Sequence, residues 1–417
     1  MKILKLSSYY YPEKISSSHL TEDIEEESIK AGYEIVVICP RPTRGISNEV
    51  YEKYKNIYYE EKYNQKVKIY RFKMFRESKS ILKRAIRYIL ISIIQYKKAL
   101  KQKDIDIIVG GSTPPTQGLL CALIKNKLSK KYRKKVRFIY SLQDVFPDSL
   151  ETTKICKKNS IIYKIGTKIM NYTYKNADKI VVISNDIYEN IIKKGVPKEK
   201  VILIRNWVDT KKVKPISENN NKLLKELNLS PKKSYIVYAG NLGKAQGIRT
   251  IIETAKLLID NKNIMFLIFG EGTEKDKIQK YIEQLKLTNI KLFPLMPSSR
   301  ISEVYSIGKF CIVTCKKGSG KNAFPSKTSA ILSTGTPIIA SFDLESELCR
   351  FIENNNCGYI VEPENATMLS KIILENIKKD DYMTKKKSAR KCAINNFDKE
   401  KNVKKYIDLY NSLIKEV

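Results

Sequence analysis

The sequence has 417 residues, more than a single hydrophobic core usually organises, so we expect two domains. Its hydrophobic content of 42%, with only 17 Gly and 14 Pro, argues against a disordered or low-complexity chain. The net charge of +34 attracts polyanions in general, such as nucleic acid, anionic lipid or phosphorylated substrates, without choosing among them.

The eight cysteines do not form a zinc motif, because no Cys-x-x-Cys pair is present and His19 is the only histidine. Most of them flank apolar runs, which favours buried, reduced thiols in a reducing compartment. The first residues enter a strand without the apolar core of a signal peptide, and no run of about twenty apolar residues predicts a spanning helix. We therefore expect a cytoplasmic protein.

Short β-branched runs alternate with segments of helical period, a pattern typical of parallel sheets covered by helices on both faces. The strands expected in the first half are 3–6, 35–38, 67–71, 105–109, 136–140 and 180–183. Those expected in the second half are 235–239, 265–269, 290–293, 310–313, 337–340 and 358–361. Each half predicts its own doubly wound α/β domain, at 1–205 and 206–395, and a last helical segment at 396–417 has to dock elsewhere.

The segment 81–103 predicts a helix in which Ile and Leu alternate with many Lys and Arg. Its apolar residues occupy more of the circumference than one buried stripe needs. Two interpretations stay open: a helix that covers the core and has solvated charges, or a basic amphipathic helix that lies on an anionic membrane.

Loops that follow strands are the place to look for chemistry, because open α/β sheets bind ligands beyond the carboxyl ends of their strands. In the first half, Tyr9–Glu13 is followed by Ser16–Ser18, which could cap a helix or face an anion. A rigid turn occupies 110–116. Asp144 follows a central strand, where its carboxylate could accept a proton, bind a hydroxyl or cap the next turn.

In the second half, the stretch from Gly240 to Gly247 opens a helix, and its glycines would let the backbone approach a phosphate. Lys244 would complement the phosphate charge, although a plain glycine turn with a solvated lysine fits equally well. Neither a Walker loop nor a dinucleotide fingerprint is present. Ser326 and Lys327 stand where another helix begins, so Lys327 is the best single candidate for binding a diphosphate.

Taken in order, these segments resemble the family 4 retaining glycosyltransferases of the GT-B fold, especially the bacterial members that build capsule, O-antigen, lipopolysaccharide and exopolysaccharide. The resemblance covers nearly the whole chain. Its matching pieces are Tyr11–Glu13, 31–35, Ser112–Pro115, Asp144–Ser149, 177–180, Asn206–Asp209, Gly240–Gly247, Gly270–Gly272, Pro325–Lys327, Gly335–Pro337 and 357–358.

The resemblance implies two doubly wound Rossmann-like domains facing a cleft, with the helix 396–417 crossing back to the first domain. Domain 1–205 would bind the acceptor and domain 206–395 the nucleotide sugar. The resemblance implies no cofactor or metal ion, and it implies a UDP-linked sugar donor as substrate. The residues implied to contact the donor are Gly240, Asn241, Gly243, Lys244, Gly270, Glu271, Ser326 and Lys327, and those implied to act in catalysis are Asp144, Lys244 and Lys327.

The sequence departs from the family pattern at several positions. Asn322 and Ala330 stand where the two carboxylates of a Glu-x7-Glu motif would fall. Asn241 replaces an arginine common in the phosphate loop, so neutralisation of the diphosphate would depend more on Lys244 and Lys327. The acceptor-side histidine of many relatives has no counterpart, and Asp144 occupies the comparable loop.

We therefore expect a retaining transferase that moves a hexosyl or N-acetylhexosaminyl group from a UDP-sugar to a polyprenyl-diphosphate-linked saccharide. It would act as a peripheral protein on the inner face of the cell membrane, bound through 81–103. One alternative is a UDP-sugar epimerase with the same double-Rossmann architecture, which needs cleft carboxylates and histidine. A nucleic-acid-binding protein would explain the charge, but no recognised motif supports nucleic acid as a partner.

Overall fold

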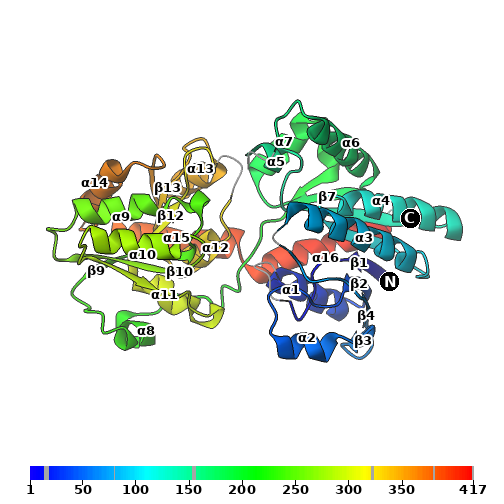
Figure 1. Cartoon of the computed structure of the whole chain (residues 1–417), viewed down its shortest axis with the longest axis horizontal. Helices are drawn as coiled ribbons and strands as arrows, with labels where there is room; N and C mark the ends of the chain where they lie inside the picture. Colours follow the sequence, from blue (N-terminus) through cyan, green and yellow to red (C-terminus); the bar gives the residue numbers. More distant parts are fainter. Residues whose placement is uncertain (14–17, 79, 153–155, 321–323, 379–380, 416–417) are drawn as a thin grey trace. The chain divides into compact units, whose positions relative to one another are not determined.

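Two α/β units make up the chain, one formed by residues 1–205 with 401–417 and the other by residues 206–400. The computed structural model describes residues 1–13, 18–78, 80–152, 156–320, 324–378 and 381–415 (Figure 1). Each unit is built on a largely parallel sheet with helices on both faces, which confirms the doubly wound architecture expected from the sequence. None of the described helices is long and apolar enough to span a membrane.

The sheet of the first unit has the strand order β3-β4-β2-β1-β5-β6-β7-β8, and only the edge strand β3 runs antiparallel to its neighbour. The strands are β1 Lys2–Leu6, β2 Glu34–Pro40, β3 Tyr59–Lys62, β4 Val67–Phe72, β5 Ile107–Gly111, β6 Arg137–Leu142, β7 Lys179–Val182 and β8 Val201–Leu203. The chain builds outward from β1 to one side and then, after β4, returns to build from β5 to the other.

The helices of the first unit are α1 Ser18–Lys30, α2 Asn48–Tyr54, α3 Ile81–Ala99, α4 Gln117–Tyr132, α5 Asp148–Thr152, α6 Ile161–Asn176, α7 Asn185–Lys193 and α16 Lys399–Lys415. Buried side chains of α3, α4, α6 and α7 share one core with the sheet. The C-terminal helix α16 packs elsewhere on this unit: the Tyr33 hydroxyl donates to Asn411 at 2.6 Å, and Arg137 donates to the Leu413 carbonyl at 3.2 Å. The return of the last helix to the first unit is thus confirmed.

The sheet of the second unit is entirely parallel and has the order β11-β10-β9-β12-β13-β14, which is the strand order of a Rossmann fold. Its strands are β9 Ser234–Asn241, β10 Ile264–Glu271, β11 Ile290–Phe293, β12 Gly308–Thr314, β13 Ile338–Ser341 and β14 Gly358–Val361. Its helices are α8 Lys222–Glu226, α9 Ile248–Leu257, α10 Lys275–Gln284, α11 Ile301–Ile307, α12 Lys327–Ser333, α13 Glu347–Asn354, α14 Ala366–Asn376 and α15 Tyr382–Asn396.

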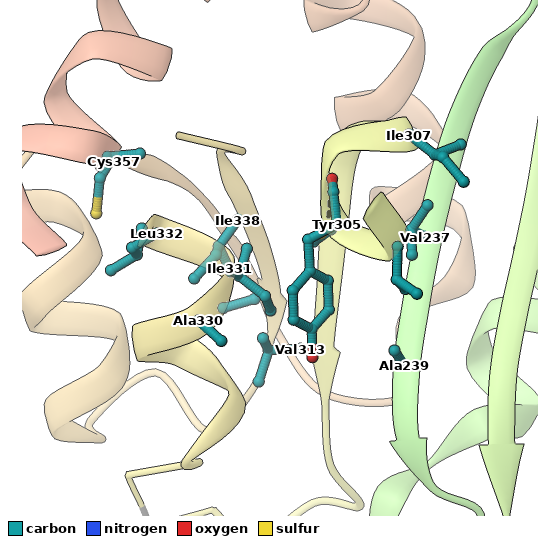
Figure 2. Close-up of a cluster of buried hydrophobic side chains, with 14 of the residues drawn as sticks. Val237, Ala239, Tyr305, Ile307, Val313, Ala330, Ile331, Leu332, Ile338 and Cys357 are labelled. Atoms are coloured by element: carbon teal, nitrogen blue, oxygen red, sulfur yellow. Dashed lines mark hydrogen bonds between the residues drawn. The ribbon is translucent and has the colours of Figure 1, made fainter. Parts of the chain in front are cut away.

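Separate apolar cores fill the two faces of the second sheet. Side chains from α9, α10 and α14 pack on one face, and side chains from α8, α11, α12, α13 and α15 pack on the other. Figure 2 shows Ala330, Ile331 and Leu332 of α12 near Val313 of β12 and Ile338 of β13. This packing fixes the first residue of α12, Lys327, at the carboxyl edge of the sheet.

The structure differs from the sequence-based expectation at the edges of elements. The edge strand β3 was not predicted because it is polar, and the edge strand β8 was not predicted because its apolar run, Val201–Leu203, has only three residues. The basic helix ends at Ala99 instead of 103. The last helix begins at Lys399 instead of 396, because Phe397 is buried in the core of the second unit.

Replacing Phe397 with alanine tests this anchoring of the chain. Its ring packs against the rings of Phe324 and Phe351, with centroids 5.7 and 5.4 Å away. Phe397→Ala should lower the free energy of unfolding by about 3–5 kcal/mol, through lost burial and the cavity left behind. Leu374→Ala, at an exposed position of α14, should change it by less than about 0.5 kcal/mol in the same urea titration. Equal effects of the two substitutions would contradict the packing described.

Candidate active site

Each sheet has one point at which the strand order reverses: between β9 and β12 in the second unit, and between β1 and β5 in the first. At such a point the following loops turn to opposite faces of the sheet, and open α/β proteins bind ligands there. The loops predicted from the sequence to carry chemistry, 240–247 and 7–13 among them, follow these strands.

Two glycines bring the ends of β9 and β10 unusually close together. Gly240 and Gly270 are partners in the strand register, and a Cβ atom on Gly270 would lie 2.5 Å from the Gly240 carbonyl oxygen. Leu242 then donates its N–H to the carbonyl oxygen of Glu271 at 2.8 Å. Any side chain at Gly270 would push these two turns apart, so the predicted glycine turn has a structural reason at this position.

The ammonium group of Lys327 lies against the first of these glycines. A Cβ atom on Gly240 would be 2.7 Å from Lys327 Nζ, and the centroid of the Tyr238 ring is 3.9 Å from the same nitrogen. Lys327 as a whole is half-buried, but its Nζ atom is buried and has no hydrogen-bond partner among the described residues. Burial lowers the pKa of Lys327 to about 7, although the Cys311 thiol acts in the opposite direction.

Two threonine hydroxyls near Lys327 in the chain are orphaned in the same way. Thr314 ends β12 and Thr328 is the second residue of α12; both side-chain oxygens are buried without a hydrogen-bond partner among the described residues. Buried polar groups in folded proteins are nearly always paired with protein or water. The three groups belong to β12 and the start of α12, beside the strand-order reversal, and this makes the reversal the candidate site for a polar ligand.

The loop after β12 is held rigidly beside the loop after β9. The carboxylate of Asp343 accepts the N–H groups of Gly318 and Gly320, both at 2.8 Å. Lys316 donates its N–H to the Ala245 carbonyl at 2.9 Å, and a Cβ atom on Gly247 would lie 2.8 Å from the Cys315 carbonyl oxygen. The two loops are therefore locked to each other before any ligand binds.

The structure sorts the predicted donor-side residues into two groups. Gly240, Gly270 and Lys327 come together, and the Asn241 carbonyl accepts a hydrogen bond from the Tyr238 hydroxyl at 2.7 Å. A Cβ atom on Gly243 would lie 2.9 Å from the Asn241 amide. Lys244, Glu271 and Ser326 are exposed at the loop surface; the Glu271 carboxylate pairs with Lys275 at 2.7 Å, and the Ser326 side chain does not cap α12.

Several residues of this site were missed by the sequence analysis. Tyr238 and Thr314 belong to strands, and their sequence context is that of ordinary core residues. Asp343 is distant in sequence from the glycines whose N–H groups it accepts. Only contact geometry identifies them. Asn322, together with Ser16 and Ser17, lies outside the described residues.

In the first unit, a buried carboxylate fixes the loop after β1. Glu13 accepts N–H groups from Thr43, Arg44 and Tyr10 at 2.7, 2.8 and 3.1 Å. Burial raises the pKa of Glu13, and these hydrogen bonds act against the rise. Arg71, which is fully buried, donates to the Tyr11 carbonyl at 2.6 Å. These contacts hold the loop in place as far as Glu13.

Polar side chains of α3 hold the same loop from the other side. Arg87 is fully buried and donates to the Phe75 carbonyl and to the Thr43 hydroxyl, the latter at 2.8 Å. Gln95 donates to the carbonyls of Ser7 and Ile38, both at 2.9 Å. Both interpretations of the segment 81–103 expected its charges to face outward; for Arg87 this was wrong, because its guanidinium donates to loops at the sheet edge.

Asp144 and the turn after β5 meet through one hydroxyl. The Ser112 side-chain oxygen accepts the N–H groups of Gln143 and Asp144 at 3.1 and 3.2 Å. The Asp144 side chain is open to solvent on one side; partial burial raises its pKa, while a hydrogen bond with Ser149 lowers it. Asp148 has a structural role instead, since it accepts from Tyr163, Asn190 and Lys194.

Orphaned polar atoms also gather at the strand-order reversal of the first unit. Ser8 follows β1, and Thr116 and Gln117 follow β5. The side-chain oxygens of all three are buried and lack a hydrogen-bond partner among the described residues. This edge therefore has the same signature as the Lys327 site, with neutral oxygens in place of a cation.

Two family models match the chain. The model described as glycosyl transferases group 1 matches residues 219–397, and the model described as glycosyltransferase family 4 matches residues 19–212. The chain is a family 4 glycosyltransferase. The two matches fall on the two units, and this identity decides against the epimerase and the nucleic-acid-binding protein.

Individual relatives agree with this assignment. The transferase is 26% identical to the colanic acid biosynthesis glycosyl transferase WcaI of Escherichia coli, over 98% of this chain and 99% of the relative. It is 24% identical to the glycosyltransferase WbjE of Pseudomonas aeruginosa, over 73% of this chain and 74% of the relative. The crystal structure of HepE from Anabaena in complex with UDP has a TM-score of 0.72 at 14% identity, covering 99% and 100% of the two chains. The transferase therefore has the GT-B fold.

The buried amine of Lys327 makes a testable difference to stability. Lys327→Met should raise the free energy of unfolding of the ligand-free transferase by roughly 1–3 kcal/mol at pH 7, because it removes a buried group that lacks a partner. Between about pH 7 and 10.5 the unfolded chain keeps the Lys327 proton while the folded chain has lost it, so wild-type stability rises with pH and the advantage of the variant shrinks.

Urea titrations at pH 7 and pH 9 measure both effects. Lys244→Met, at an exposed position, is the matched control and should change the free energy of unfolding by less than about 0.5 kcal/mol at either pH. A Lys327→Met variant that is less stable than the wild type at pH 7 would contradict the description of an unpaired amine.

Proposed function

We propose that this glycosyltransferase moves a hexosyl or N-acetylhexosaminyl group from a UDP-sugar, with retention, to a polyprenyl-diphosphate-linked saccharide in surface polysaccharide synthesis. The observation that carries the donor half of the proposal is the buried, unpaired ammonium of Lys327 beside Gly240. A cation that lacks a protein partner at a strand-order reversal is suited to an anionic ligand, and a diphosphate is the anion that a nucleotide sugar offers.

Three features support a nucleotide diphosphate over a smaller anion. The open glycine turn at 240–243 lets the backbone approach the phosphates, and the exposed Lys244 can approach from the solvent side. Thr314 and Thr328 offer two further hydroxyls. HepE, which shares the fold, was crystallised with UDP and also with UDP-glucose.

In the proposed reaction the bond between the sugar C1 and the phosphate oxygen breaks, and UDP leaves with the bonding electrons. The acceptor hydroxyl forms the new glycosidic bond on the same face, and its proton passes to the departing phosphate. Lys327 and Lys244 stabilise the negative charge that develops on the diphosphate, and a group fixed in advance does this most effectively. Binding of the diphosphate protonates Lys327, because a nearby negative charge favours the charged form of an amine.

The acceptor half of the proposal rests on the first unit. Buried oxygens of Ser8, Thr116 and Gln117 can exchange hydrogen bonds with sugar hydroxyls, and Asp144 can bind the hydroxyl that reacts. WcaI, which aligns with nearly the whole chain, takes part in colanic acid biosynthesis according to its name, and this supports a saccharide acceptor of a surface polymer. A lipid-linked acceptor places the reaction at the inner face of the membrane, where the exposed apolar and basic residues of α3 can bind.

Thermal stabilisation by nucleotide sugars tests the donor half directly. A UDP-sugar at about 100 times its dissociation constant should add about 2.7 kcal/mol to the free energy of unfolding. Lys327→Ala should abolish most of this effect, whereas Lys256→Ala, at an exposed position of α9, should leave it unchanged. The donor assignment fails if no nucleotide sugar stabilises the protein, or if Lys327→Ala binds UDP as tightly as the wild type.

A further inference from the structure

We infer that α3 and α6 insert two apolar ridges into an anionic bilayer, at the same edge of the first unit as the acceptor loops, while α4 between them rests on the lipid headgroups. The inference rests on the proposed function in that the acceptor is lipid-linked. It adds a second inserting helix, a depth for each helix and an orientation of the first unit on the membrane.

These three helices share one sign of charge, as does α15 of the second unit. Their sequences contain Lys and Arg but no Asp or Glu, although the chain has 44 acidic residues. The exposed cations are Lys83, Arg84 and Lys97 of α3, Lys127, Lys130 and Lys131 of α4, and Lys164, Lys168 and Lys175 of α6. A surface with one sign of charge attracts the opposite sign, which here is an anionic lipid surface.

Helices α3 and α6 each expose several large apolar side chains, which is unfavourable in water. On α6, Ile161 and Ile162 are 75% and 61% exposed, and Ile165 follows at the next turn. On α3, Leu82 is 70% exposed, and the same exposed side carries Ile86, Ile89, Leu90 and Ile93. The exposed apolar residues of α6 form one apolar ridge, and those of α3 form the other. Exposed ridges flanked by cations fit an interface between headgroups and acyl chains.

The inward side of α3 is partly polar, although Ile91 and Ala99 also face the core. Arg87 and Gln95 take up buried positions because they bind loops at the edge of the sheet. A helix in water usually has the reverse arrangement, with polar residues outside and apolar residues within. The helix thus has polar residues at two buried positions and an apolar ridge on its exposed side, and this ridge needs a cover that water cannot supply.

Both ridges begin beside loops of the candidate acceptor site. On α3, the Tyr88 hydroxyl lies 3.3 Å from the Tyr9 hydroxyl in the loop after β1. On α6, a Cβ atom on Gly166 would lie 2.7 Å from the ring of Phe146, and Phe146 belongs to the loop that contains Asp144. The ridges thus mark the carboxyl edge of the sheet, where the acceptor saccharide is proposed to bind.

The middle helix joins the two ridges into one layer. Gln117 at the start of α4 donates to Gln95 of α3 at 3.2 Å, and Asn126 of α4 donates to the Tyr172 hydroxyl of α6 at 3.3 Å. The exposed residues of α4 are mainly Lys and Asn, with Leu123 as the apolar exception. In this layer α3 and α6 insert into the acyl region, and α4 lies at the lipid phosphates. A lipid-linked acceptor would then reach the loops while its lipid stays in the bilayer.

Fluorescence of introduced tryptophans measures this geometry, because Trp207 is the only tryptophan in the chain and is 3% exposed. We would compare Ile89→Trp, Ile162→Trp, Lys127→Trp and Leu257→Trp on vesicles of phosphatidylglycerol with brominated acyl chains. Emission from the first two should shift to the blue and be quenched strongly. Lys127→Trp should be quenched less, and Leu257→Trp, in the second unit, should show neither a shift nor quenching when vesicles are added.

Binding of the same vesicles gives an independent readout. Ile89→Glu and Ile162→Glu should each weaken cosedimentation roughly tenfold or more, since each places a charge where an apolar side chain inserts, whereas Leu257→Glu should have no effect. All variants should still be stabilised by the UDP-sugar that stabilises the wild type, so a failure here is distinct from a failure of the donor assignment.

Three outcomes would overturn the inference. The first is a wild-type protein that does not sediment with anionic vesicles at low salt. The second is a protein that sediments but shows no quenching at positions 89 and 162. The third is a response at α3 alone, which would remove α6 from the membrane and with it the proposed orientation.

Discussion

A buried amine that has no hydrogen-bond partner among the described residues is the constraint on which the donor side depends. The ammonium of Lys327 lies between the Tyr238 ring and the α-carbon of Gly240, and burial lowers its pKa to about 7. The described elements around it are held by their own contacts: α12 by its apolar packing, the β9 turn by paired glycines, and the β12 loop at Gly318 and Gly320 by Asp343. The protein therefore tolerates an unfavourable arrangement that an anionic ligand would relieve, which is the usual relation between stability and function at a site.

The two units share a doubly wound fold and, in the function proposed, bind different partners. In both, the strand order reverses once, and buried polar atoms without partners collect there. In the second unit the set is led by an amine, which suits phosphate; in the first unit the oxygens of Ser8, Thr116 and Gln117 suit hydroxyl groups. The first unit also differs in its outer layer, since α3 makes polar contacts at the sheet edge and exposes apolar residues on its other side.

Much of this could be predicted from the sequence, and the remainder depends on contacts that no local pattern encodes. Alternation of strands and helices predicted both sheets, and the glycine turns and Lys327 stood out because they follow strands. Tyr238 and Asp343 could not be found, because one has the appearance of a core residue and the other acts on glycines distant in the chain. Arg87 was misplaced for a related reason: amphipathic periodicity assumes that charges face water, and a loop that needs buried donors reverses it.

The most direct test of the account is the titration of Lys327 itself, followed by NMR of the lysine side-chain nitrogens, with Lys327→Met used to assign the resonance. The account predicts a pKa near 7 in the free protein, as burial of the amine requires, and a marked rise when UDP binds. A pKa close to the ordinary lysine value of 10.5 in the free protein, unchanged by UDP, would contradict the claim that this amine is held without a partner for the donor diphosphate.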